Sequence, residues 1–123
     1  MGTILIVEDE YAIADLLEMV LSDAGYQTRT AANGQEALAQ LAEGLRPNLI
    51  ITDLMMPVLN GAEMIKQLRQ DAVLRDIPYV LMSSIPEQQV LERLDGYSAF
   101  LRKPFSLMHV VPLVTGILSG KLT

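Results

Sequence analysis

Short blocks of apolar residues alternate along the chain with segments in which apolar residues recur every three or four positions. The blocks at 3–7, 48–52 and 79–82 contain β-branched residues and are too short for helices. Continuous blocks of this kind are typical of strands that are buried on both faces of a parallel sheet. Two weaker blocks, at 26–31 and 99–101, are further strand candidates. The pattern therefore predicts five strands.

Helical periodicity fills the intervals between these strands. The first helix is expected at 11–24, with one buried stripe made of Ile13, Leu16, Leu17, Val20 and Leu21. Further helices are expected at 35–43, around 64–68, as a short segment around 90–94, and from about 106 to 118. Pro112 lies inside the last segment and should kink that helix or delay its start.

Five strands alternating with five helices predict right-handed βαβ crossovers and an α/β fold with a doubly wound parallel sheet and helices on both faces. The more polar second strand suits an edge position, as in the flavodoxin-like order 2-1-3-4-5. The chain has 123 residues, half of them apolar, which is the size of one ordinary domain with a continuous core. We interpret residues 1–123 as a single domain.

Composition and charge exclude several classes of function. No run approaches the ~18 apolar residues that a membrane span needs, and the N-terminal segment lacks the basic flank of a secretory leader. We therefore expect a soluble, cytoplasmic protein with no membrane contact. The absence of cysteine excludes disulfides and thiolate metal sites. Fifteen acidic residues against nine basic ones, a net charge of −6, disfavour direct binding to nucleic acid.

Polar residues follow four of the five predicted strands at their carboxyl ends, where open α/β sheets bind ligands. They are Glu8 and Asp9 after the first strand, Asp53 after the third, Ser83 after the fourth and Lys103 after the fifth. Three carboxylates in one pocket would repel one another unless they shared a cation, and oxygen ligands suit Mg²⁺. Asp53 stands alone after a buried strand and is the candidate nucleophile for phosphoryl transfer. The adjacent Glu8 and Asp9 are better suited to holding the metal.

At these positions the sequence resembles the receiver domains of two-component response regulators, the CheY-like superfamily. Four motifs carry the resemblance: the acidic segment Ile4-Leu5-Ile6-Val7-Glu8-Asp9-Glu10, the loop Asp53-Leu54-Met55-Met56-Pro57 with Gly61, the pair Ser83-Ser84, and Lys103-Pro104-Phe105. Each motif alone is weak. Four of them in order, at the ends of successive strands and over essentially the whole chain, are highly specific.

The resemblance implies roles for the site residues. Asp53 would receive a phosphoryl group from a sensor histidine kinase or a phosphotransfer protein. Mg²⁺ would be held by Glu8, Asp9, Asp53 and the backbone carbonyl of Met55. The only chemistry expected is self-phosphorylation and autodephosphorylation, so the chain would be a signalling domain and not an enzyme.

The resemblance also implies a conformational switch. Ser83 would bond a phosphoryl oxygen, Lys103 would pair with the phosphoryl group, and Phe100 occupies the position of the switch aromatic. The fourth helix, fifth strand and last helix would form an output face for a downstream effector or a second copy of the chain. Family likeness and the turn that aims Lys103 together predict a cis peptide bond between Lys103 and Pro104.

Two departures from the family pattern leave open which partner, or which dimer geometry, the output face serves. Ser83 stands where threonine is common, which keeps the hydroxyl and loses a methyl group. The stretch from Ser83 to Lys103 is slightly short, and it contains Gly96-Tyr97-Ser98-Ala99 in place of a more usual Gly-Ala-Asp-Asp-like run.

Three other functions fit the sequence less well. A phosphatase of the haloacid-dehalogenase class needs a second acid two residues after the nucleophile, where this chain has Met55. A flavodoxin-like cofactor binder needs a phosphate-cradling loop after the first strand, where the acids from Glu8 to Glu10 would repel phosphate. A receiver that serves only as a docking module would not need its site residues, and all of them are present. Taken singly, the acids could be helix caps and Phe100 plain core.

Overall fold

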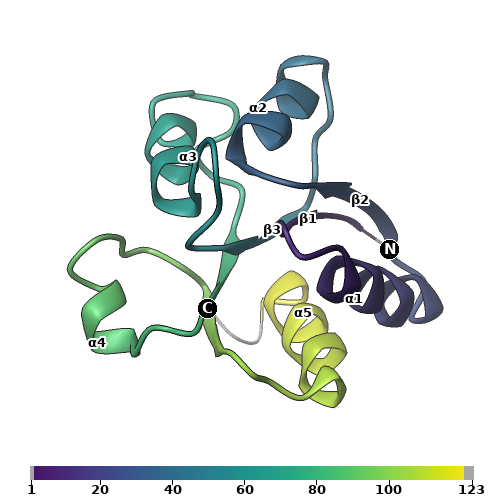
Figure 1. The fold of residues 1–123 in the computed structure, drawn as a ribbon. Helices are drawn as coiled ribbons and strands as arrows, with labels where there is room; N and C mark the ends of the chain where they lie inside the picture. Colours follow the sequence, from purple (N-terminus) through teal and green to yellow (C-terminus); the bar gives the residue numbers. More distant parts are fainter. Residues whose placement is uncertain (1, 121–123) are drawn as a thin grey trace.

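The computed structural model describes residues 2–120, in which strands and helices alternate (Figure 1). The strands are β1 (Thr3–Val7), β2 (Gln27–Ala31), β3 (Leu49–Asp53), β4 (Tyr79–Ser83) and β5 (Ala99–Arg102). The helices are α1 (Tyr11–Asp23), α2 (Gly34–Ala42), α3 (Gly61–Leu68), α4 (Glu87–Val90) and α5 (Val110–Leu118). A 3₁₀ turn, Leu107–His109, directly precedes α5.

The five strands form one parallel sheet in the order β2-β1-β3-β4-β5, which confirms the predicted topology. Every residue of β3 and β4 is buried, whereas β2 at the edge is largely exposed. The apolar blocks thus lie in the middle of the sheet and the polar one at its rim, because only the central strands are covered on both faces.

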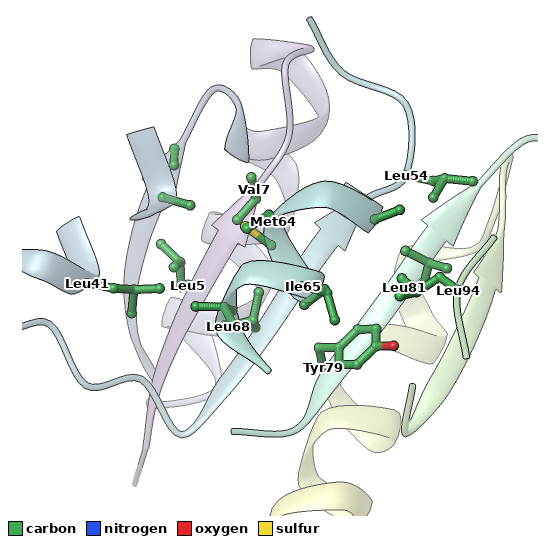
Figure 2. Packing of buried hydrophobic residues seen from close by; sticks show 14 of the residues in the cluster. Leu5, Val7, Leu41, Leu54, Met64, Ile65, Leu68, Tyr79, Leu81 and Leu94 are labelled. Atoms are coloured by element: carbon green, nitrogen blue, oxygen red, sulfur yellow. The ribbon is translucent and has the colours of Figure 1, made fainter. Parts of the chain in front are cut away.

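Two hydrophobic cores lie on opposite faces of the sheet. One packs Leu17 and Leu21 of α1 and Val114 and Ile117 of α5 against alternate residues of the strands. The other lies under α2, α3 and α4. Figure 2 shows Met64 and Leu68 of α3 beside Val7 and Leu5 of the sheet, and Leu94 beside Leu81. Figure 1 shows the same division, with α1 and α5 on one side and α2 and α3 on the other.

The buried stripe of α1 is narrower than predicted. Ala14, Leu17 and Leu21 are buried, but Leu16 is 44% exposed, so its place in the stripe was wrong. Adjacent residues point about 100° apart around a helix of 3.6 residues per turn. Because Leu17 faces the sheet, Leu16 is turned toward solvent.

Two helices differ from the expected ranges: α5 begins later than expected, and α4 lies earlier in the chain. The last one starts late: α5 begins at Val110, and Pro112 lies in its first turn, where a backbone N–H has no partner within the helix. The delayed start predicted from Pro112 is confirmed. The fourth is short but lies at 87–90 and not around 90–94, with Leu91 52% exposed. Between residues 2 and 120, the protein has no helix with the length and apolarity required to cross a membrane.

Candidate functional site

The register of the sheet brings the polar strand ends together. Val7 pairs with Thr52, Asp53 with Met82, and Ser83 with Arg102. The residues at the carboxyl ends of β3 and β4, and those directly after β1 and β5, therefore meet at one edge of the sheet. They surround a depression of about 260 Å³ lined by Asp9, Asp53, Met55, Ser83 and Lys103, among others.

Lys103 joins the two most buried carboxylates of the site. Its Nζ donates to Glu8 Oε1 at 2.7 Å and to Asp53 Oδ2 at 2.8 Å. The side chain of Glu8 is fully buried, and that of Asp53 is 9% exposed. The Lys103 backbone N–H donates to the Ser83 carbonyl at 2.8 Å, which holds the lysine beside β4. The Lys103–Pro104 bond is cis, as predicted.

The electrostatic environment differs between the acid and the lysine. Burial raises the pKa of Glu8 from 4.5 to about 7, against the hydrogen bonds from Lys103 and the Glu10 N–H. Burial lowers the pKa of Lys103, but the hydrogen bonds to Asp53 and Glu8 outweigh it and raise that pKa above its usual 10.5. A single ammonium group therefore serves two carboxylates. Further positive charge beside Glu8 would favour its ionised form.

Glu8, Asp9 and Asp53 form a cluster that can bind a metal ion. Each offers one carboxylate oxygen, and these oxygens lie within 4.8 Å of one another. Glu8 and Asp53 are buried and Asp9 is half-buried, so the cluster has a buried side and a more open side. An all-oxygen donor set with room for water fits Mg²⁺. Met55 borders the same depression with its side chain 51% exposed.

The two predicted switch residues lie apart, on neighbouring strands. Ser83 is buried, and its Oγ accepts a hydrogen bond from the Ile85 N–H at 3.0 Å. That bond is the turn-stabilising role expected of any serine at a strand end. Phe100, on β5, is half-buried and packs on Tyr97 with ring centroids 5.8 Å apart.

Sequence reasoning missed Thr52 as a support of β3, the strand that ends at Asp53. Its hydroxyl is buried and donates to the Asp53 carbonyl at 2.9 Å. Gly61 packs against the same carbonyl: a Cβ at Gly61 would lie 2.2 Å from the Asp53 oxygen, so α3 can start there only with glycine. A polar residue at the end of an apolar strand was the available signal for Thr52.

The loop between β3 and α3 contains a strained residue that sequence reasoning also missed. Val58 has φ 69°, and the Leu59 N–H donates to the Pro57 carbonyl at 2.8 Å, which closes a three-residue γ-turn. The Leu59 carbonyl in turn accepts from the Gly34 N–H at 2.9 Å, so the start of α2 supports the loop. Valine disfavours this conformation, so no sequence pattern pointed to it.

Known proteins resemble the chain in sequence and in fold. The family model for the response regulator receiver domain matches residues 4–115. The alkaline phosphatase synthesis transcriptional regulatory protein PhoP of Bacillus subtilis is 39% identical over 117 residues, which cover 94% of this chain and 48% of PhoP. The chain thus spans about half the length of that relative.

Solved structures show the same fold. A signal receiver domain of a signal transduction histidine kinase from Syntrophus aciditrophicus superposes with a TM-score of 0.87 and 37% identity, covering 98% of this chain and 92% of that one. The response regulator protein TrrA of Thermotoga maritima, solved in complex with Mg²⁺-BeF, has a TM-score of 0.82 and 28% identity, covering 95% of this chain and 99% of that one.

Proposed function

Because the chain belongs to the response regulator receiver domain family, and is thus a signalling domain of two-component systems, we propose that Asp53 is its phosphoacceptor. Glu8, Asp9, Asp53 and the Met55 backbone carbonyl would hold the Mg²⁺ that the reaction uses. The phosphoryl donor would be a histidine kinase or a phosphotransfer protein. That residues 1–123 form a single domain, and that it works in the cytoplasm, stay predictions from the sequence.

The observation that carries this proposal is the position of Lys103 between Glu8 and Asp53. The lysine holds Asp53 at 2.8 Å, at the rim of the depression, while Glu8 lies fully buried beneath. A carboxylate that lines the depression and lies next to a fixed cation is suited to attack phosphorus. The two other acids are better placed as metal ligands, since Glu8 is buried and Asp9 lies directly after it in the chain.

The chemistry is a displacement at phosphorus. One Asp53 oxygen forms a bond to phosphorus while the bond from phosphorus to the donor's leaving group breaks, and the leaving group keeps the electron pair. The Lys103 ammonium, now bound to Asp53, can then pair with a phosphoryl oxygen. Bound Mg²⁺ would supply charge neutralisation and orientation for the phosphoryl oxygens. Thr52 and Gly61 keep the Asp53 backbone in place for the attack.

The output face is also part of the proposal. The α4, β5 and α5 elements would bind a downstream effector or a second copy of the chain. PhoP is named a transcriptional regulator and is about twice as long as this chain. We therefore assign no contact with DNA to the residues described.

The test is the substitution Asp53→Asn, which preserves shape but cannot attack phosphorus as a carboxylate does. The protein and the variant are incubated with acetyl phosphate and Mg²⁺, and intact masses are measured. We expect a phosphoryl adduct on the protein and none on the variant, with circular dichroism showing that both are folded. An adduct of equal yield on Asp53→Asn would exclude Asp53 as the acceptor, and no adduct on either would indicate a docking module.

A further inference from the structure

The α4 segment, residues 84–98, has few apolar anchors to the rest of the protein. Its helix has a single turn; Val90 and Leu94 are buried in the core, and Ile85 and Tyr97 are partly buried against it. Leu91 is exposed, and residues 91–93 form turns. A segment with so little buried apolar surface depends on other contacts for its position.

One set of polar contacts ties the end of this segment to α3. The Arg69 guanidinium binds the Asp95 carboxylate at 3.1 Å and also its carbonyl oxygen. The Tyr79 ring lies in the core (Figure 2), and its hydroxyl donates to the same carbonyl. Gly96 follows with φ 83°, a conformation that glycine adopts without strain.

A second contact ties the beginning of the segment to β5 through Tyr97. The Tyr97 hydroxyl donates to Glu87 Oε2 at 2.5 Å, in the first turn of α4. The Tyr97 ring stands edge-on to Tyr79, with centroids 6.5 Å apart, and packs on Phe100 at 5.8 Å and 45°. One side chain therefore contacts both α4 and Phe100.

We propose that Tyr97 is a positioning residue of the switch: its bond to Glu87 and its ring contact with Phe100 couple the position of α4 to the rotamer of Phe100. This inference rests on the proposed function, because it assigns a mechanical link between the switch residue Phe100 and helix α4 of the output face. A phenylalanine on β5 has no hydroxyl with which to reach α4. Tyr97 supplies that hydroxyl from three residues earlier.

The direction of the effect follows from the state in which these contacts occur. In the structure described, Lys103 donates to the Asp53 carboxylate and Ser83 Oγ accepts from the Ile85 N–H. The Tyr97–Glu87 bond belongs to this same arrangement. Rotation of Phe100 away from Tyr97 removes the ring contact that supports the hydroxyl, so α4 is released. Loss of the hydroxyl should therefore favour the activated arrangement before any phosphoryl group is present.

The experiment compares Tyr97→Phe with Tyr26→Phe in the full chain. The control also loses one tyrosine hydroxyl with a defined bond, since Tyr26 contacts Thr115 Oγ1 at 2.8 Å on the opposite face of the sheet. Amide hydrogen exchange is measured in α4 of the unphosphorylated proteins. Loss of one hydrogen bond to a carboxylate at an exposed position should speed exchange of the Leu91 amide about three- to tenfold in Tyr97→Phe, and leave it unchanged in Tyr26→Phe.

A second readout links α4 to the switch. Amide NMR shifts near Phe100 are recorded with and without Mg²⁺ and beryllium fluoride, and unliganded Tyr97→Phe should move toward the positions of the liganded wild type. A double variant with Glu87→Ala should add little to Tyr97→Phe, because both remove the same bond. Unchanged Leu91 exchange and unchanged shifts in Tyr97→Phe would overturn the proposal.

The two proposals fail separately in this design. If the wild type gives no phosphoryl adduct and no response to beryllium fluoride, the proposed function is wrong, and the exchange rates still decide whether Tyr97 holds α4. If the adduct forms normally but Tyr97→Phe behaves like Tyr26→Phe, the proposed function stands and the role of Tyr97 is wrong.

Discussion

At the scale of single residues, the site contains more negative than positive groups. Glu8, Asp9 and Asp53 bring three carboxyl groups within 4.8 Å, and Lys103 bonds two of them. Burial raises the pKa of Glu8 to about 7, and the neighbouring Asp53 charge adds to the increase, so the site has a deficit of positive charge. A divalent cation on the open side would remove that deficit. The acid on that side, Asp9, should therefore contribute strongly to metal affinity.

We expect Asp9→Asn to weaken Mg²⁺ binding by at least about tenfold, because it removes a charged ligand from a three-carboxylate site. The matched control is Asp15→Asn, which removes the same charge from the exposed surface of α1. Isothermal titration of Mg²⁺ into each variant at fixed ionic strength measures the effect. Equal affinities for the two variants would show that Asp9 is not a ligand.

At the scale of elements, the loop between β3 and α3 combines a strained turn with a close backbone contact beside Asp53. The γ-turn at Val58 and the absence of a Cβ at Gly61 let the chain reverse within a few residues of Asp53. A left-handed conformation costs a residue with a Cβ roughly 1–2 kcal/mol. The loop therefore keeps part of its shape at the expense of stability.

Val58→Gly should raise the free energy of unfolding by about 0.5–1 kcal/mol, since glycine relieves the strain but gains conformational freedom in the unfolded chain. Val58 is 73% exposed, so little packing is lost. Urea denaturation followed by circular dichroism measures the change. The control is Val73→Gly, at a similarly exposed valine outside any helix or strand, which should leave the free energy of unfolding unchanged or lower it. If Val58→Gly also lowers the free energy of unfolding, Val58 is not strained.

The elements also show which features the sequence could predict. Continuous apolar blocks identified the central strands, and Pro112 identified the late start of α5, because both effects are local. The side chains at the carboxyl ends were identified because topology places all strand ends at one edge. The sequence did not predict which side chains bond to one another. The bonds from Lys103 to Glu8 and Asp53, and from Tyr97 to Glu87, depend on side-chain directions between residues that are 10 to 95 positions apart. The exposure of Leu16 likewise depends on how α1 is rotated against the sheet.

At the scale of the whole molecule, the sheet connects the proposed acceptor site to the proposed output face over two strands. Asp53 ends β3, Ser83 ends the neighbouring β4, and Phe100 lies on β5, paired with Leu81. Ser83 Oγ accepts from Ile85, which leaves its hydroxyl proton free to donate. A phosphoryl group on Asp53 would add charged acceptor oxygens beside that hydroxyl. The hydroxyl can then turn inward, and Phe100 can occupy the space that it leaves.

We predict that Ser83→Ala uncouples phosphorylation from the output face. A hydrogen bond from a hydroxyl to a charged group is worth about 1.5–3 kcal/mol, which changes a two-state ratio by roughly 10- to 150-fold. That bias is enough to move a balanced equilibrium and too small to move a strongly one-sided one. Relaxation-dispersion NMR of the phosphorylated variant should therefore show output-face shifts closer to the unphosphorylated protein than phosphorylated wild type does. Ser84→Ala, which removes a hydroxyl from the exposed neighbour of Ser83, should keep the wild-type shifts, and wild-type shifts in phosphorylated Ser83→Ala would show that the coupling runs by another route.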